Sequence, residues 1–202
     1  MLQQQAAQIY ARLCAVYGLP TWRMPLPALD ELVSTILSQN TNDRNRDIAF
    51  ERLRQAFESW EAVRDANVEQ VIEAIRPAGL ANQKGPRIQA VLRQITDEVG
   101  RLDLSLLQDM TVEAARAWLM RFQGVGPKTA AIVLLFSLGK PDFPVDTHIY
   151  RVSGRLGLRP PEMTVEQAHG HLAGLFAPES YGPAHLNLIR LGREVCTARK
   201  PL

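Results

Sequence analysis

Apolar residues recur along most of the chain at the three- and four-residue spacing of an amphipathic helix, and no clear alternating run predicts a strand. Turn signals separate the periodic segments into pieces of about 8 to 18 residues. Two early stripes with a polar far side consist of Leu29, Leu32, Val33, Ile36 and Leu37, then Ile48, Phe50, Leu53 and Phe57. The pattern predicts an all-α protein.

Capping residues mark the helix boundaries in the middle of the chain. Asn67, with Gln70 three positions later, resembles a capping box before a helix that Pro77 ends. The next apolar stripe ends at Gly100 and consists of Ile88, Val91, Leu92 and Ile95. Thr111 is suited to the N-cap of the following helix.

The segment 127–139 is apolar almost all round, so we expect its helix to be buried and central. In the last third, Thr164 and Gln167 have the spacing of another capping box. Joints rich in proline and glycine are predicted near residues 20–28, 139–144, 159–162 and 177–183. No internal repeat interrupts this organisation.

Composition limits the function classes. The chain has 202 residues, 46% of them hydrophobic, which is enough for one large domain or two small ones. No apolar run approaches the roughly 20 residues needed to cross a bilayer, and the start lacks the features of a signal peptide. We therefore expect a cytoplasmic, nucleoid-associated protein with no membrane partner.

Cysteine usage and net charge limit the function classes less strongly. Cys14 and Cys196 are the two cysteines of the sequence, which suits a reducing compartment and excludes a disulfide framework. A formal net charge of +2 is too small to indicate a nucleic-acid partner. Local clusters of charge must decide that question.

The stretch FQGVGPKTA contains the first chemical motif. Gly124 and Gly126 flank Val125 between two predicted helices, and Pro127 occupies a first helical position, where a missing N–H is tolerated. Glycines remove the Cβ atoms that would hold a phosphate away, and the free N–H groups at a helix start attract anions. The motif matches a helix-hairpin-helix that grips the DNA backbone without reading bases. A tight helix–helix turn without a ligand is the alternative.

Lys128 lies in the first turn of the following helix, where the macrodipole disfavours a cation by about 0.3–1 kcal/mol. Stability alone would not select it. An exposed lysine and a simple phosphate contact are two interpretations. The third is a nucleophile, because the positive helix end and partial desolvation favour the neutral amine that can attack carbon.

Asp146 follows in VDTHIYR, where an aspartate is an ordinary helix N-cap. A helix over 127–138 rises roughly 18 Å, and the extended segment 139–145 spans roughly 23 Å. The extended segment is therefore just long enough to bring Asp146 back beside Lys128. Such a pair suits proton removal and cation stabilisation during attack at a sugar C1′.

These motifs together resemble the endonuclease III family of helix-hairpin-helix DNA glycosylases. The similarity runs through ILSQNTND at 36–43, GLANQKGPRI at 79–88, GVGPKTA, VDTHIYRV and HLNLIRLGREVCTARKP near the C-terminus. It implies an all-α, two-lobed fold with a DNA-binding cleft between the lobes. It also implies that Lys128 forms a Schiff base with deoxyribose and that Asp146 is the activating carboxylate. The adenine-removing relatives lack this lysine, so we expect a bifunctional glycosylase and abasic-site lyase that cuts by β-elimination.

The resemblance assigns further residues to DNA binding. Gln39 or Asn40 would plug the gap left by a flipped base, and Leu80 would wedge into the stack; by themselves these are a polar helix end and a turn with an exposed leucine. Arg46 belongs to the expected phosphate contacts. His148 is a hydrogen-bonding support, since no second His or Cys stands at metal-ligand spacing. The remaining DNA-binding candidates are Arg44, Lys84, Arg87, Gly124, Val125, Gly126 and Thr129.

Two features depart from the family pattern. Many members carry a four-iron, four-sulfur cluster on four cysteines, and Cys196 matches the first, whereas the second would fall one residue beyond Leu202. The sequence as it stands predicts no cofactor, a cluster being expected only if the native chain extends past Leu202; Cys196 is otherwise a small buried hydrophobe. Phe122 and Gln123 replace a usual Leu-Pro, and we expect Phe122 to pack regardless.

The sequence thus predicts a helical bundle over residues 28–139, with both wedge loops and the hairpin, and a second lobe from residues 1–27 and 140–202. The expected function is excision of oxidised pyrimidines from duplex DNA that contains a damaged base or an abasic site, by a monomer. That substrate class rests on family analogy. A glycosylase for uracil or mismatched thymine, and a non-catalytic DNA-binding module, are the alternatives.

Overall fold

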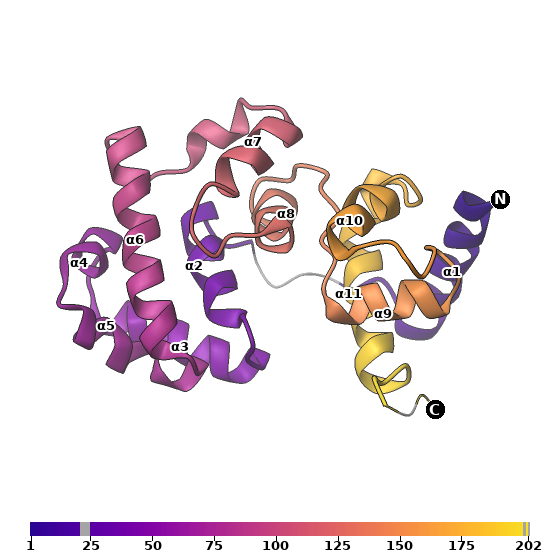
Figure 1. The fold of residues 1–202 in the computed structure, drawn as a ribbon, viewed down its shortest axis with the longest axis horizontal. Helices are drawn as coiled ribbons and strands as arrows, with labels where there is room; N and C mark the ends of the chain where they lie inside the picture. The colour runs from indigo at the N-terminus through magenta and orange to yellow at the C-terminus, as the bar shows by residue number, and fades with distance from the viewer. Residues whose placement is uncertain (21–24, 200, 202) are drawn as a thin grey trace. The chain divides into compact units, whose positions relative to one another are not determined.

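The computed structural model describes residues 1–20, 25–199 and 201, and these residues form helices and connecting segments without a strand (Figure 1). The predicted all-α fold is confirmed. The chain divides into two compact units, residues 26–133 and residues 1–25 with 134–202. The division falls inside one helix, earlier than the boundary suggested by the sequence. Of the predicted joint near 20–28, residues 21–24 lie outside the described residues.

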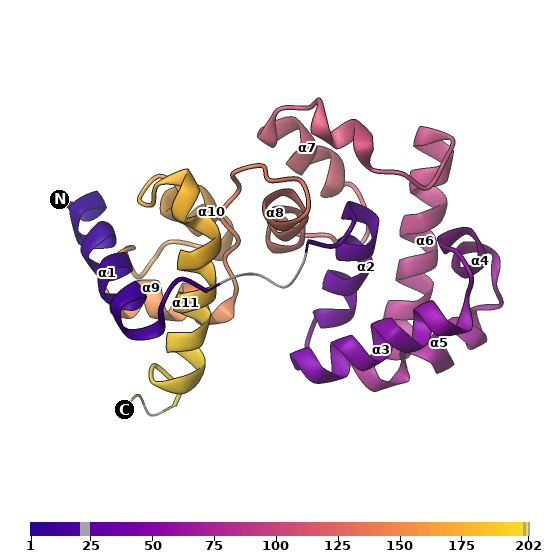
Figure 2. The same cartoon turned by 180° about the vertical axis from the view of Figure 1, so that it is seen from behind.

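The first unit is built around α6, Ala81–Val99, which contacts α2, α4 and α5 (Figure 2). The other elements are α2 (Ala28–Ser38), α3 (Asp43–Ala56), α4 (Trp60–Asp65), α5 (Val68–Ile75), the 3-10 turns Arg76–Ala78 and Ser105–Gln108, α7 (Val112–Leu119) and the start of α8 (Pro127–Phe136).

The hydrophobic stripes read from the sequence form the core of this unit. Burying one Leu or Ile side chain contributes about 1.5–3 kcal/mol, so these faces fix how the helices pack. The buried stripe residues are Leu29, Leu32, Val33, Ile36 and Leu37 on α2, and Ile88, Val91, Leu92 and Ile95 on α6.

Capping follows the sequence closely. The Thr111 hydroxyl accepts a hydrogen bond from Ala114 N at 3.2 Å, which confirms it as an N-cap. Asn67 also caps its helix, accepting from Glu69 N at 3.2 Å, but no bond from the Gln70 side chain completes the predicted box.

The GLANQK loop is shorter than the sequence suggests, because α6 begins at Ala81 and leaves Gly79 and Leu80 outside a helix. Pro86 lies within α6. Gly85 allows close packing there, since a Cβ at this position would lie 2.8 Å from Ile72 Cγ1 of α5. Tertiary packing therefore outweighs the turn signal of the Gly-Pro pair.

The second unit contains α1 (Leu2–Tyr17), the end of α8, α9 (Thr147–Arg155), α10 (Val165–Ala173), the 3-10 turn Pro178–Ser180 and α11 (Tyr181–Glu194). Helix α11 packs against α1 and α9. Phe143 stacks on Phe176 with ring centroids 5.2 Å apart. The Thr164 and Gln167 capping box is present, as predicted.

Helix α8 is buried from Thr129 to Leu134, as its uniform apolarity predicts. It is followed by residues 139–146, which form no helix before α9. None of the helices in the described ranges combines the length and the apolar character needed to span a membrane.

Candidate nucleic-acid interface

The hairpin joins α7 to α8 through residues 120–126. Phe122 is 1% exposed and meets Trp118 edge to face at 4.8 Å, so it packs as expected. Val125 and Thr129 are 5% and 4% exposed. Their side chains are turned into the protein, so a DNA contact at these positions would be made by the backbone, and it stays a prediction.

The two hairpin glycines serve different purposes. Gly124 has φ of 82°, and a Cβ there would lie 2.4 Å from Arg87 Cδ, so the molecule itself requires a glycine. Gly126 has no positive φ, and no atom lies within 4 Å of a Cβ built on it. The open space over Gly126 is what the approach of a phosphate to the N-terminus of α8 requires.

Gln39 and Arg87 connect the hairpin to the rest of the unit. Gln39 Nε2 donates to Gly124 O at 2.9 Å, and Arg87 Nη1 donates to Gln39 Oε1 at 3.0 Å. Arg87 Nε is buried without a hydrogen-bond partner among the described residues. The structure therefore brings together three of the predicted residues, which come from the C-cap of α2, from α6 and from the turn before α8.

Both loops that the sequence singled out contain a residue in the left-handed region. Asn40 has φ of 53° and Leu80 has φ of 50°, and within the described part of the chain no other non-glycine residue has a positive φ. This conformation costs roughly 1–2 kcal/mol per residue and persists where neighbouring structure enforces it, often at functional sites. Both side chains are exposed, Leu80 by 47%.

Lys84 does not have the predicted role. Its side chain is 1% exposed, and Nζ donates to Leu37 O at 2.8 Å and to Ala78 O at 2.9 Å. Burial, and to a smaller extent the nearby Arg87 charge, lower the pKa of Lys84 to about 8. A buried ammonium bound to two carbonyls cannot contact a phosphate, so that prediction is wrong.

The arginines at the start of α3 differ from each other. Arg44 is exposed and forms no ion pair within the described residues. Arg46 lies 3.2 Å from Asp43 Oδ1 and 2.8 Å from Asp47 Oδ1, with its side chain 14% exposed. Two carboxylates already neutralise Arg46, whereas Arg44 is available to a phosphate.

Lys128 is half-buried in the first turn of α8, directly after the hairpin, as the sequence predicts. Asp146 is the N-cap of α9, and its Oδ1 accepts from Ile149 N at 2.8 Å. The ordinary capping role of Asp146 is thus confirmed. The two residues belong to different units, so their approach to each other stays a prediction.

His148 has the supporting contacts expected of it. Its Nδ1 lies 3.1 Å from Arg151 Nη2, which also donates to Gly192 O at 2.8 Å. Because arginine can only donate, Nδ1 of the neutral ring is the acceptor and Nε2 carries the proton. The Nε2–H group is therefore the donor that His148 can offer to a ligand.

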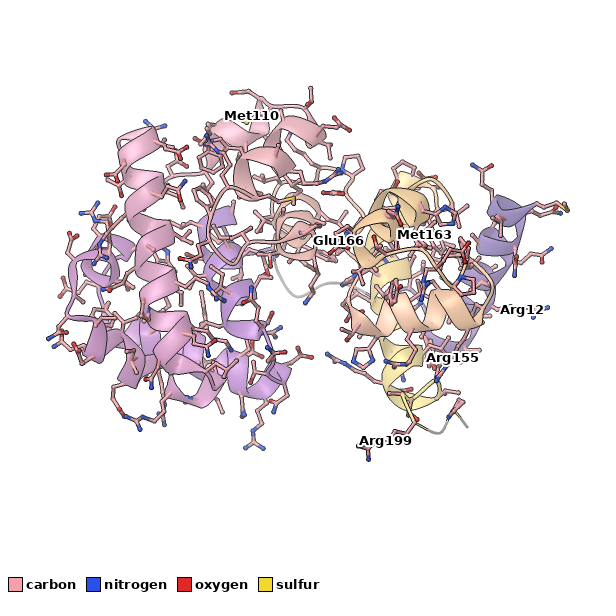
Figure 3. All side chains as sticks on the ribbon, in the orientation of Figure 1. Arg12, Met110, Arg155, Met163, Glu166 and Arg199 are labelled. Atoms are coloured by element: carbon pink, nitrogen blue, oxygen red, sulfur yellow. The ribbon has the colours of Figure 1, made fainter. Side chains whose placement is uncertain are left out.

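Arg155 of α9, labelled in Figure 3, holds the segment that contains Cys196. It donates to Cys196 Sγ at 3.3 Å, to Thr197 O at 2.7 Å and to Ala198 O at 3.0 Å. Cys196 is half-buried rather than fully buried. A four-iron cluster takes four thiolates, whereas the sequence has two cysteines, so the residues present do not fit that cofactor.

Comparison with known proteins identifies the fold and the family. The model of the HhH-GPD superfamily base excision DNA repair proteins matches residues 33–178. The chain belongs to this superfamily. The match runs from within α2 to beyond the end of α10, and it therefore includes the hairpin, both loops, Lys128 and Asp146.

Individual relatives support the same family. The chain is 35% identical to endonuclease III of Sulfolobus acidocaldarius over 173 residues, 85% of this chain and 75% of that protein. It is 40% identical over 144 residues to a candidate DNA glycosylase of Arabidopsis thaliana, covering 71% of this chain and about half, 49%, of that relative. A solved endonuclease III–DNA covalent intermediate with an estranged adenine superposes with a TM-score of 0.84 and 25% identity, covering 98% and 90% of the chains. The resemblance to the endonuclease III family is confirmed.

Proposed function

We propose that this protein is a base-excision DNA glycosylase that also cleaves the strand at abasic sites. Membership of the superfamily supports excision of a base from DNA. The observation that carries the lyase activity is Lys128, an amine at the start of buried helix α8 immediately after a hairpin suited to a DNA phosphate. A cation at this place is unfavourable for the helix, so stability alone does not select a lysine here and a chemical role is favoured.

In the proposed reaction Lys128 Nζ attacks C1′ of the damaged nucleotide, and the bond from C1′ to the base breaks. Asp146 takes up the proton that the attacking amine releases and passes it to the departing base, which leaves in its neutral form. Opening of the sugar ring gives a Schiff base between Nζ and C1′. Loss of a C2′ proton then expels the 3′ phosphate by β-elimination, and water releases the enzyme.

Access to the base requires flipping it out of the duplex, at a cost of a few kcal/mol. Leu80, exposed on its turn, is suited to wedge into the stack. Asn40 is exposed, whereas the Gln39 side chain already bonds Gly124 O and Arg87. We therefore favour Asn40 as the first group to enter the gap, with Gln39 following only if it releases these two bonds.

The proposed substrate is duplex DNA that contains an oxidised pyrimidine, by similarity to endonuclease III. Uracil or mismatched thymine would use the same catalytic residues. Release of each base from otherwise identical duplexes separates these choices, and the fastest release is expected for the oxidised pyrimidine.

Borohydride trapping tests the chemistry. Wild-type protein mixed with abasic-site duplex and sodium borohydride should form a covalent adduct, because reduction fixes the Schiff base. Lys128→Ala should form none while still binding DNA, and Lys140→Ala, which removes another half-buried lysine, should form the normal amount. Equal adduct from wild type and Lys128→Ala would remove Lys128 from its role, and a wild type without adduct would contradict the proposed lyase activity.

A further inference from the structure

We infer that Lys84 is a positioning residue that fastens both base-flipping loops to helix α6 so that they meet the duplex as one unit. The inference rests on the proposed function and assigns a role to a buried residue that contacts neither DNA nor the reacting atoms.

The geometry joins two loops that are distant in the sequence. Leu37, whose carbonyl accepts from Nζ at 2.8 Å, lies two residues before Gln39. Ala78, whose carbonyl accepts at 2.9 Å, lies two residues before Leu80. One cation therefore holds the chain just before the proposed plug and just before the proposed wedge.

Lysine is well suited to this place. Leu37 is in the last turn of α2 and Ala78 ends the 3-10 turn, so both carbonyls lie where a helix leaves its acceptors without partners. The C-terminal ends of helices also attract positive charge. An ammonium has three donors, more than a neutral side chain of similar reach supplies, and its bonds to carbonyls are charge-assisted.

The residues held in this way are the strained ones. Asn40 and Leu80 have left-handed φ values, which require enforcement by their surroundings. The Lys84 backbone N–H also donates to Leu80 O at 2.9 Å. One helical turn later, Arg87 fixes the Gln39 side chain. Helix α6 thus controls both loops through two basic side chains and its first backbone bonds.

A purely structural role would weaken every property of the folded protein alike. A positioning role would reduce the preference for a flipped site over ordinary duplex, because phosphate contacts do not depend on the loops. The ratio of the dissociation constant for ordinary duplex to that for abasic-site duplex separates these roles. Measuring it does not require catalysis.

The experiment compares Lys84→Met, which keeps the length of the side chain without its donors, with the matched control Gln89→Met. Gln89 lies on the same helix, is 2% exposed, and donates to Val63 O at 2.9 Å and Ala66 O at 2.8 Å, away from both loops. Dissociation constants are measured for an undamaged duplex and for the same duplex with a tetrahydrofuran abasic analogue opposite 2-aminopurine.

The preference of Lys84→Met for the abasic duplex should be about tenfold smaller than that of wild type, which is the change expected from one charge-assisted hydrogen bond. Its binding to undamaged duplex should equal that of wild type. The 2-aminopurine signal that reports insertion should fall with it. Gln89→Met should lower the melting temperature and keep the preference. If Lys84→Met does not fold, Lys84→Gln, whose shorter side chain reaches one carbonyl at best, takes its place.

An unchanged preference in a folded Lys84 variant would overturn the inference and leave the proposed function standing. Absence of a borohydride adduct from the wild type would instead overturn the proposed lyase activity, and the inference would still be decided by the ratio of dissociation constants.

Discussion

At the scale of single residues, the least predictable position is Lys84. A lysine four residues after an exposed leucine, in a chain that resembles a DNA-binding family, indicates a phosphate contact. Its real acceptors include Leu37 O, 47 residues away in the sequence. Local sequence carries no information about that distance. Gly124 shows the opposite case, because its need for a positive φ follows from the hairpin motif itself.

The burial of Lys84 predicts a pH dependence of stability. Its pKa is about 8 in the folded protein and near 10.5 in an unfolded chain, so between these values the unfolded chain binds more protons. The contribution of Lys84 to stability therefore rises with pH across this window and is smallest below pH 8. Denaturant unfolding at about pH 7.5 and 9.5 should show wild type gaining stability relative to Lys84→Met. A difference that does not change with pH would contradict the lowered pKa.

The two hairpin glycines make a second pair of residue-scale tests. Gly126→Ala meets no atom within 4 Å, so the melting temperature should hardly change while the dissociation constant for DNA rises. Gly124→Ala should destabilise the protein by about 1 kcal/mol or more, because of its φ and the Arg87 contact. Wild-type DNA affinity in Gly126→Ala would argue against a phosphate over this glycine.

At the scale of elements, helices with a clear apolar stripe and a capping residue could be placed from sequence alone. The helices that begin after the caps Thr111 and Thr164 are examples. The start of α6 could not, because it contains the two strong breakers Gly85 and Pro86 and is helical only through packing on α5. Helix α4 has 6 residues and few periodic positions, so the sequence pattern does not predict it.

The start of α3 gives a prediction at this scale. Arg44→Gln should weaken DNA binding and make its dependence on salt shallower by about one charge, because a free arginine releases a counterion on contact with a phosphate. Arg46→Gln is the matched control, since its charge is already balanced by Asp43 and Asp47. Titrations of duplex at several salt concentrations compare the slopes. Equal slopes for Arg44→Gln and wild type would remove Arg44 from the interface.

At the scale of the whole molecule, the motifs in their order along the chain were sufficient to indicate the superfamily. The sequence predicts lobes of residues 28–139 and of residues 1–27 with 140–202, whereas the division into compact units lies within α8, after residue 133. The juxtaposition of Lys128 and Asp146, and the cleft expected to hold DNA, depend on how the units meet. Chain length between the two residues allows their approach but does not determine it.

The most direct test of the account is the chemical identity of the trapped amine. Wild-type protein is reduced with borohydride on abasic-site duplex, digested with nuclease and protease, and mapped by mass spectrometry. A reduced sugar remnant is expected on the side chain of Lys128, in the peptide that begins α8. A remnant on another lysine or on the N-terminal amine would contradict it.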